Sequence, residues 1–176
     1  KAGNEQGRFF INKIWNALKL VRSWELRVQG QDATSQAVPN GQNNKFAVQW
    51  FENRLNEARI EIDEMYKDFR LSEILKKIYS LIWDDFCSWY LEWIKPPMDG
   101  KISKEVYDNT IGFFEELMQL LHPFMPFVTE EIYHLLEERT GDLMIKEFGR
   151  EEKADAEILN NGVLLKNIIT GLRDVR

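Results

Sequence analysis

The stretch from Leu71 to Lys95, LSEILKKIYSLIWDDFCSWYLEWIK, constrains the fold more than any other part of the chain. At the period of an α-helix, its apolar side chains form one broad stripe. The stripe contains Leu71, Leu75, Ile78, Ile82, Phe86, Trp89 and Trp93, and it is widened by Tyr79, Trp83, Tyr90 and Ile94. A helix with so broad an apolar face must be covered by several partners. Pro96 ends the helix, because proline disfavours helix at the residue before it. The stretch therefore predicts the long central helix of a helical bundle.

The rest of the chain predicts more helices and almost no strand. Apolar stripes at helical spacing predict helices at about 4–26 and 46–66, one capped by Ser103, a short one capped by Thr129 and ended by Gly141, and a last one at 157–176. The alternating charges along 46–66 indicate a solvated face. A polar loop at 29–44 and an irregular connection at 142–156 join these helices. The prediction is a single all-α domain, residues 1–176, with about five or six helices in a bundle.

Composition and charge narrow the function classes. The net charge of −6 is unlike the basic excess of most nucleic-acid-binding domains. Cys87 is the single cysteine, so no internal disulfide can form, and charges break the apolar runs well short of a membrane span. The chain opens on Lys1 without a methionine and closes inside a helical pattern. We expect an internal fragment of a longer protein that does not enter a membrane.

No set of residues predicts catalysis. Cys87 with His122 or His134 could form a nucleophile and base, but Cys87 lies between aromatic residues of the central helix and is predicted to be buried. His122 precedes a proline and is expected to meet the last carbonyls of a helix. Acid pairs such as Asp84–Asp85 point in different directions on a helix. The two histidines and the cysteine have none of the spacings of a metal site. The sequence predicts no catalytic residue, no metal and no cofactor.

The polar face of the first predicted helix is the most informative surface. It holds Arg8, Asn12, Trp15, Asn16, Lys19 and Arg22, at spacings that place all six on one side. One interpretation is an ordinary solvated face. The other is a platform for single-stranded RNA, in which cations meet phosphates, amides meet base edges and an indole stacks on a base. Trp50 could be a second stacking group or a core residue.

Three motifs resemble one family. They are RFFINKIWNA at 8–17, DFCSWYLE at 85–92 with Lys95-Pro96 after it, and HPFMPFVTEEI at 122–132. They are similar to motifs of the anticodon-binding helical domain of class I aminoacyl-tRNA synthetases, in the same order and across nearly the whole chain. The second motif favours the valyl-tRNA synthetase family over its isoleucine and leucine relatives.

The resemblance implies a non-catalytic part of a monomeric, cytoplasmic valine–tRNA ligase that binds the anticodon stem-loop of tRNA. Valine and ATP would bind only in a catalytic domain, whose ATP-site motifs have no counterpart here. It also implies that Arg8, Lys19 and Arg22 meet phosphates or base edges, that Asn12 and Asn16 form hydrogen bonds, and that Trp15 or Trp50 stacks. Trp89, Tyr90 and the corner 122–127 would belong to the core.

Two departures from the family pattern fall near the expected site. Asn16-Ala17-Leu18-Lys19 replaces the family's Asn-Ala-Ser-Arg, so the planar fork of an arginine is lost at Lys19. Ala47-Val48-Gln49-Trp50 replaces Ala-Asp-Arg-Trp. Two alternatives stay open: a related isoleucyl- or leucyl-type synthetase, or a helical protein-interaction module whose exposed tryptophans bind a partner helix.

Overall fold

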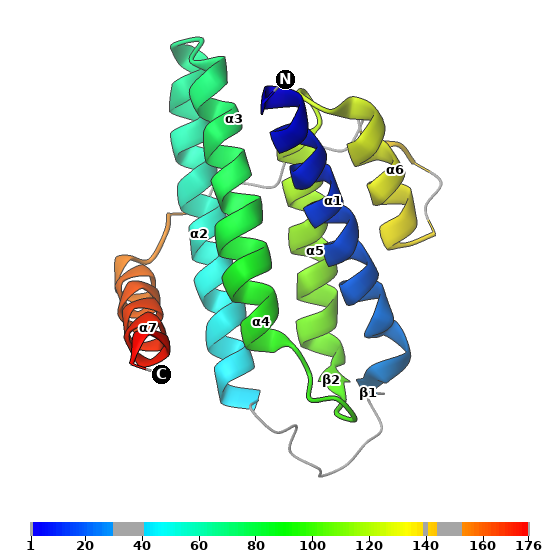
Figure 1. Ribbon diagram of the computed structural model, residues 1–176, viewed down its shortest axis with the longest axis vertical. Helices are drawn as coiled ribbons and strands as arrows, with labels where there is room; N and C mark the ends of the chain where they lie inside the picture. Colours follow the sequence, from blue (N-terminus) through cyan, green and yellow to red (C-terminus); the bar gives the residue numbers. More distant parts are fainter. Residues whose placement is uncertain (1, 30–40, 139–140, 144–152, 176) are drawn as a thin grey trace.

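The computed structural model describes residues 2–29, 41–138, 141–143 and 153–175, and these residues form an α-helical bundle (Figure 1). The helices are α1 (Ala2–Ser23), α2 (Gly41–Lys67), α3 (Leu71–Ser80), α4 (Leu91–Ile94), α5 (Lys104–Leu121), α6 (Pro126–Leu136) and α7 (Ala156–Asp174). A π-helical segment, Leu81–Tyr90, joins α3 to α4 without a break, so the described residues contain six continuous α-helical rods. The prediction of an all-α bundle of five or six helices is confirmed.

Two short elements close one end of the bundle. A 3-10 turn (Glu25–Arg27) follows α1 and leads into β1 (Val28–Gln29), which pairs in parallel with β2 (Ile102–Ser103). This pairing was not predicted, because two residues are too short for an alternating pattern. Ser103 then caps α5, since its hydroxyl accepts a hydrogen bond from Val106 N–H at 3.2 Å, as predicted.

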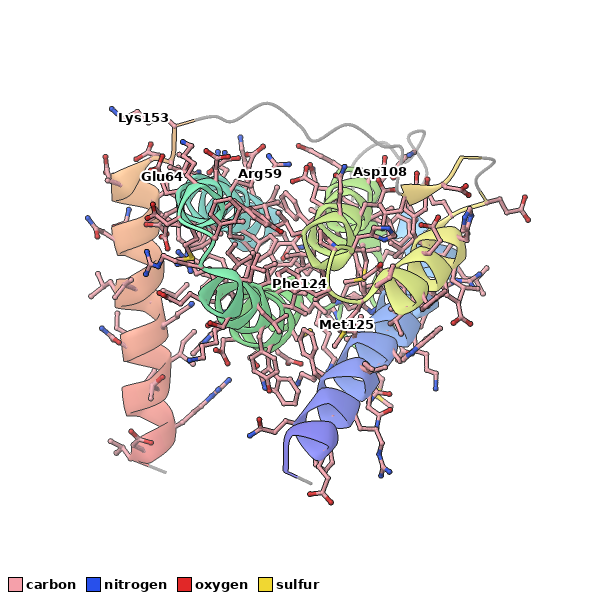
Figure 2. All side chains as sticks on the ribbon, turned by 90° about the horizontal axis from the view of Figure 1, so that it is seen from above. Arg59, Glu64, Asp108, Phe124, Met125 and Lys153 are labelled. Carbon is pink, nitrogen blue, oxygen red and sulfur yellow. The ribbon has the colours of Figure 1, made fainter. Side chains whose placement is uncertain are left out.

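The helices are arranged around a four-helix centre. α1, α2, the central helix and α5 run side by side, and α6 packs against α1 and α5 (Figure 1). Seen from above, α7 lies outside α2, on the side of the bundle opposite α1 and α6 (Figure 2). No helix among the described residues is both long and apolar enough to span a membrane.

The π-helical segment corrects the predicted stripe of the central helix. The buried positions recur every four residues, at Ile74, Ile78, Ile82, Phe86, Tyr90 and Ile94. A four-residue repeat drifts around an α-helix of 3.6 residues per turn, and the wider i→i+5 turns keep it on one face. Leu71, at the start of α3, is exposed, and Trp89 and Trp93 lie at the edge of the face, half-buried. The predicted burial of Tyr90 is confirmed, and its hydroxyl lies 2.9 Å from Thr110 Oγ1.

The charged face predicted for α2 is solvated only in part. Arg54 donates to Asp85 Oδ2 on the π-helical segment, at 2.9 and 3.2 Å, although Asp85 is only 6% exposed. Arg59 points toward α5 and pairs with Glu116 at 2.5 Å (Figure 2). The alternating charges of α2 therefore include residues that pair with other helices as well as residues that face solvent.

Several predicted boundaries were wrong. Gln29 belongs to β1 and α2 already begins at Gly41, so the polar connection is shorter than 29–44. The start predicted for the last helix was correct to within one residue: α7 begins at Ala156, where the Asp155 carboxylate accepts from Glu157 N–H at 2.9 Å and from the next amide. Residues 30–40 and 144–152 lie outside the described part.

α6 also differs from its prediction. It begins at Pro126, which suits the first turn of a helix because its missing N–H would have no partner there. Thr129 is therefore inside the helix, where its hydroxyl bonds to a carbonyl of the preceding turn at 2.9 Å rather than capping. The helix ends at Leu136, before Gly141. Phe124 and Met125 are half-buried against the core, but Phe127 is 88% exposed and no residue of the corner 122–127 is fully buried, so its assignment to the core was wrong.

Candidate nucleic-acid interface

α1 is amphipathic, and its packing fixes which side faces solvent. Its predicted apolar stripe is buried in the core: Phe10, Ile14, Ala17, Leu18 and Val21. The helix lies against the π-helical segment and α6, and its opposite side is covered by no other described element. The polar face predicted from the sequence is thus presented to solvent, at one edge of the bundle (Figure 1).

The side chains of that face are accessible, as predicted. Arg8, Asn12, Asn16, Lys19 and Arg22 are exposed, and they follow the helix over most of its length. Trp15 is half-buried, because part of its indole packs against the core. The face therefore offers three cations, two amides and one edge of an aromatic ring.

The electrostatics of the face favour an external anion. Among the described residues, no carboxylate forms an ion pair with Arg8, Lys19 or Arg22. The exposed carboxylates of Glu5 and Glu25 lie at the two ends of the face. A run of three cations without paired acids is an exception in a chain of net charge −6.

Trp50 does not belong to this face, and its prediction as a base-stacking residue was wrong. The indole is 1% exposed, and the backbone of α7 passes directly over it at Gly162. Trp93 meets it edge-on with ring centroids 4.8 Å apart, and Lys166 Nζ lies 4.4 Å from its centroid. Base stacking needs an open ring face, and an indole that is only 1% exposed offers none.

The tryptophans also remove the basis of the protein-interaction alternative. Trp24 and Trp50 are buried, and the other four, Trp15, Trp83, Trp89 and Trp93, are half-buried against the core. A module that captures a helix through exposed tryptophans would need at least one of them free at the surface. None of the six is.

Arg27 is a positioning residue that the sequence did not reveal. It donates to the carbonyls of Gly100 at 3.0 Å and Met98 at 2.6 Å, and also to that of Pro97. These bonds join the end of α1 to the turn after α4, so they fix the orientation of the C-terminal half of the polar face. The sequence shows only an arginine just after the end of a predicted helix. Nothing in it indicates that this arginine contacts a turn 70 residues further along the chain.

Cys87 and His122 behave as structural residues. Burial raises the pKa of the Cys87 thiol to about 12, although nearby Lys13 acts to lower it, so the thiol is a poor nucleophile. His122 Nδ1 lies 2.8 Å from Thr129 Oγ1, so it bonds to the start of α6 rather than to the last carbonyls of α5 as predicted. The prediction of a buried, structural Cys87 is confirmed.

An exposed helix with three cations and one aromatic edge, on the surface of a helical bundle, fits the class of α-helical nucleic-acid-binding domains. Comparison of the sequence narrows this class. Residues 48–176 match the family described as the anticodon-binding domain of tRNA ligase, and the chain belongs to this family.

The chain is similar to several valine–tRNA ligases. It is 42% identical to that of Porphyromonas gingivalis over 175 residues, 40% identical to that of Phocaeicola vulgatus over 174, and 33% identical to that of Enterococcus faecalis over 172. These matches cover 95–98% of the chain and 19% of each relative. The chain therefore spans about a fifth of the length of the curated relatives it matches.

Proposed function

We propose that this chain is the anticodon-binding part of a valine–tRNA ligase and that the polar face of α1 contacts the anticodon stem-loop. The whole enzyme would join valine to its tRNA with ATP, in a catalytic part outside this chain, as a monomer in the cytoplasm. Family membership and the relatives' names support the tRNA as partner. The three exposed cations of α1, which pair with no carboxylate in the described part of the chain, support the location.

Each group on the face has a defined role in this proposal. Arg8, Lys19 and Arg22 bind backbone phosphates, because they are exposed, have no ion-pair partner among the described residues, and lose little on exchanging water for phosphate. Asn12 and Asn16 carry donors and acceptors that match base edges. Together they follow the helix over several turns and can contact consecutive nucleotides.

The test is fluorescence anisotropy with a labelled valine-tRNA anticodon stem-loop and the same stem with a scrambled loop. The variant is Lys19→Ala/Arg22→Ala. The matched control is Lys67→Ala/Arg70→Ala, which removes the same charge where exposed ion pairs with Asp63, Glu64 and Glu73 already satisfy both cations. We expect the first variant to weaken binding at least tenfold and the control to leave it within about twofold.

The salt dependence of the binding affinity distinguishes RNA binding from the docking of an apolar helix. If three cations each displace one counterion, affinity falls roughly 20- to 40-fold between about 50 and 200 mM salt. Docking of an apolar helix changes little over the same range. Binding that is insensitive to salt, or that is equal in the variant and the control, would contradict a site on α1. Equal binding of both stem-loops would show stem recognition without reading of the anticodon.

A further inference from the structure

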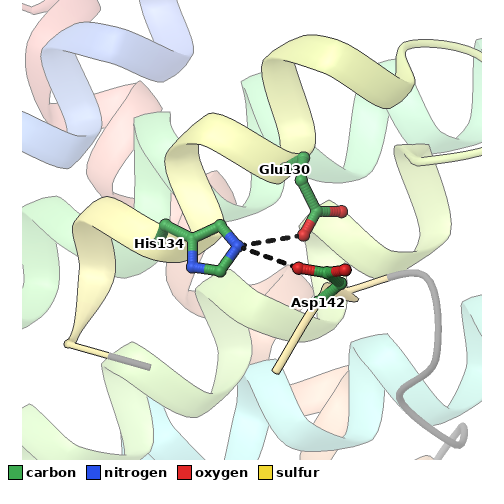
Figure 3. Close-up of side chains that lie close together, drawn as sticks. All are labelled: Glu130, His134 and Asp142. Carbon is green, nitrogen blue, oxygen red and sulfur yellow. Dashed lines mark ion pairs between the residues drawn. The ribbon is translucent and has the colours of Figure 1, made fainter. Parts of the chain in front are cut away.

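Three side chains with metal-binding atoms meet beside α6 (Figure 3). Glu130 and His134 are one turn apart on this helix, and Asp142 reaches them from the segment that follows it. His134 Nε2 lies 3.2 Å from Glu130 Oε1 and 3.5 Å from Asp142 Oδ1. One ligand atom from each residue lies within 4.8 Å of the other two.

These separations fit a small divalent ion. Zinc binds histidine nitrogen and carboxylate oxygen at about 2.0–2.2 Å, so two ligands of a tetrahedral site lie roughly 3.4 Å apart. The two distances from His134 Nε2, 3.2 and 3.5 Å, bracket this value. Two carboxylates and an imidazole are also a donor set that zinc accepts.

The surroundings hold Glu130 in place. Its Oε1 accepts a hydrogen bond from the Leu143 N–H at 2.8 Å, and Leu143 is anchored in the core at 2% exposure. Its other oxygen lies 3.9 Å from His122 Nδ1. A carboxylate fixed by such outer contacts keeps its free lone pairs aimed at the position between the three ligands.

Among the described residues that line the site, no lysine or arginine compensates its charge. The three residues line a cavity of about 490 Å³ together with Glu131, and no lysine or arginine is among the described residues around it. With His134 neutral the three candidate ligands carry two negative charges, which a divalent ion would balance. The simpler interpretation is a protonated histidine paired with both acids, and it predicts no affinity for metal.

We propose that Glu130, His134 and Asp142 bind a zinc ion whose fourth position is open to the cavity and filled by water. The ion adds a side-chain link between residues 141–143 and α6 to the backbone hydrogen bond from Leu143 to Glu130, and Asp142, 71% exposed at its side chain, supplies it. The site is structural, and it lies on a different helix from the polar face of α1.

The test is titration of the tag-free, chelator-treated chain with zinc chloride, by calorimetry and by thermal unfolding. We expect one zinc per chain and a rise in Tm with zinc. His134→Ala and Asp142→Asn should each weaken binding by more than the roughly tenfold that loss of an outer contact costs. Glu52→Gln, an exposed carboxylate on α2, is the control and should bind as wild type does.

Cobalt gives a second measurement that a change in folding does not imitate. Cobalt bound in a site of this kind shows intense visible absorption. Adding zinc should displace the cobalt and remove this absorption, and His134→Ala should abolish it. Zinc binding that is equal in the His134 and Asp142 variants would place the ion elsewhere and overturn the proposal. Absence of a heat signal and of a Tm shift would also overturn it, in favour of the paired histidine.

Discussion

Two groups of cations, on opposite sides of the molecule, have different environments. Arg8, Lys19 and Arg22 on α1 are exposed and have no carboxylate partner among the described residues. Arg54 of α2 and Lys166 of α7 converge on Asp85, which accepts from them at 2.9 and 2.7 Å. All five carry the same charge, but only the first group can accept an external anion without breaking the fold.

The difference lies in what each group stabilises. Lys166 Nζ also lies over the rings of Trp50 at 4.4 Å and Trp89 at 5.5 Å, so the Asp85 cluster attaches α7 to the bundle. A charge held in this way contributes to folding, because leaving it unpaired and partly buried is costly. A charge held by water alone contributes little to folding and is available for binding.

The largest expected effect follows from removing Asp85. Asp85→Ala leaves Arg54 and Lys166 without their shared partner, at about one-fifth side-chain exposure each. We expect a loss of about 3 kcal/mol in the free energy of unfolding, measured by urea denaturation. Asp84→Ala is the control, since this neighbour is exposed and should change stability by less than about 0.5 kcal/mol. Similar losses in both variants would mean that the cluster does not attach α7.

Packing between α7 and Trp50 gives the next effect. A Cβ atom at Gly162 would lie 2.1 Å from Trp50 Nε1, so Gly162→Ala must displace α7 or the indole. We expect a loss of about 1–3 kcal/mol in urea denaturation and faster proteolysis of α7. Gly171→Ala on the same helix meets nothing within 4 Å and should stabilise the chain by about 0.5–1 kcal/mol. Stabilisation by both substitutions would show that α7 is not seated on Trp50.

The pH dependence of the free energy of unfolding tests whether Cys87, on the central helix, is buried. Burial raises the pKa of Cys87 to about 12, above its unfolded value of about 8.5–9. The unfolded state therefore loses its thiol proton first, so stability is full below about pH 8.5 and falls as pH rises toward 12. Between pH 8 and 10 the loss from Cys87 is about 1.5 kcal/mol. Cys87→Ala should be less stable at pH 8 but show a flatter slope, and an unchanged slope would contradict a buried thiol.

The smallest effect is expected on α1. Lys19→Ala/Arg22→Ala should change the free energy of unfolding by less than about 0.5 kcal/mol, because both cations are exposed and neither pairs with a carboxylate among the described residues. Lys166→Ala removes one cation from the other group, and it should cost more than this double variant does. Equal losses would remove the distinction between the two groups, and the measurement is the same urea denaturation.

The helices were predictable because their apolar residues recur at helical period. The burial of Ile78, Ile82 and Phe86 follows from that pattern alone. The π-helical segment was not predictable, since it changes the period without any marker residue. The end of α2 was also unmarked: Phe69 has φ 55°, in the left-handed region where glycine is usual, and Arg70 N–H bonds back to the Met65 carbonyl at 2.9 Å.

The candidate functional residues also differ in how far the sequence alone could predict them. The polar face of α1 was predictable because one helix carries all of it, and local spacing decides which residues share a face. Trp50 was misassigned because the residue that covers it, Gly162, is more than a hundred positions away and has no side chain. Asp142 could not be connected to His134 from the sequence, since a connection of irregular backbone has no period.

The bonds of Arg27 have a consequence for the order in which the bundle assembles. Its acceptors are 70 to 73 residues further along the chain, so the ring they close encloses α2 and the whole central helix. Closing so long a loop is favourable only after the intervening helices have packed. The end of the bundle that carries β1 and β2 should then be the last to acquire protection from hydrogen exchange during folding. In the native state it should be the first to open.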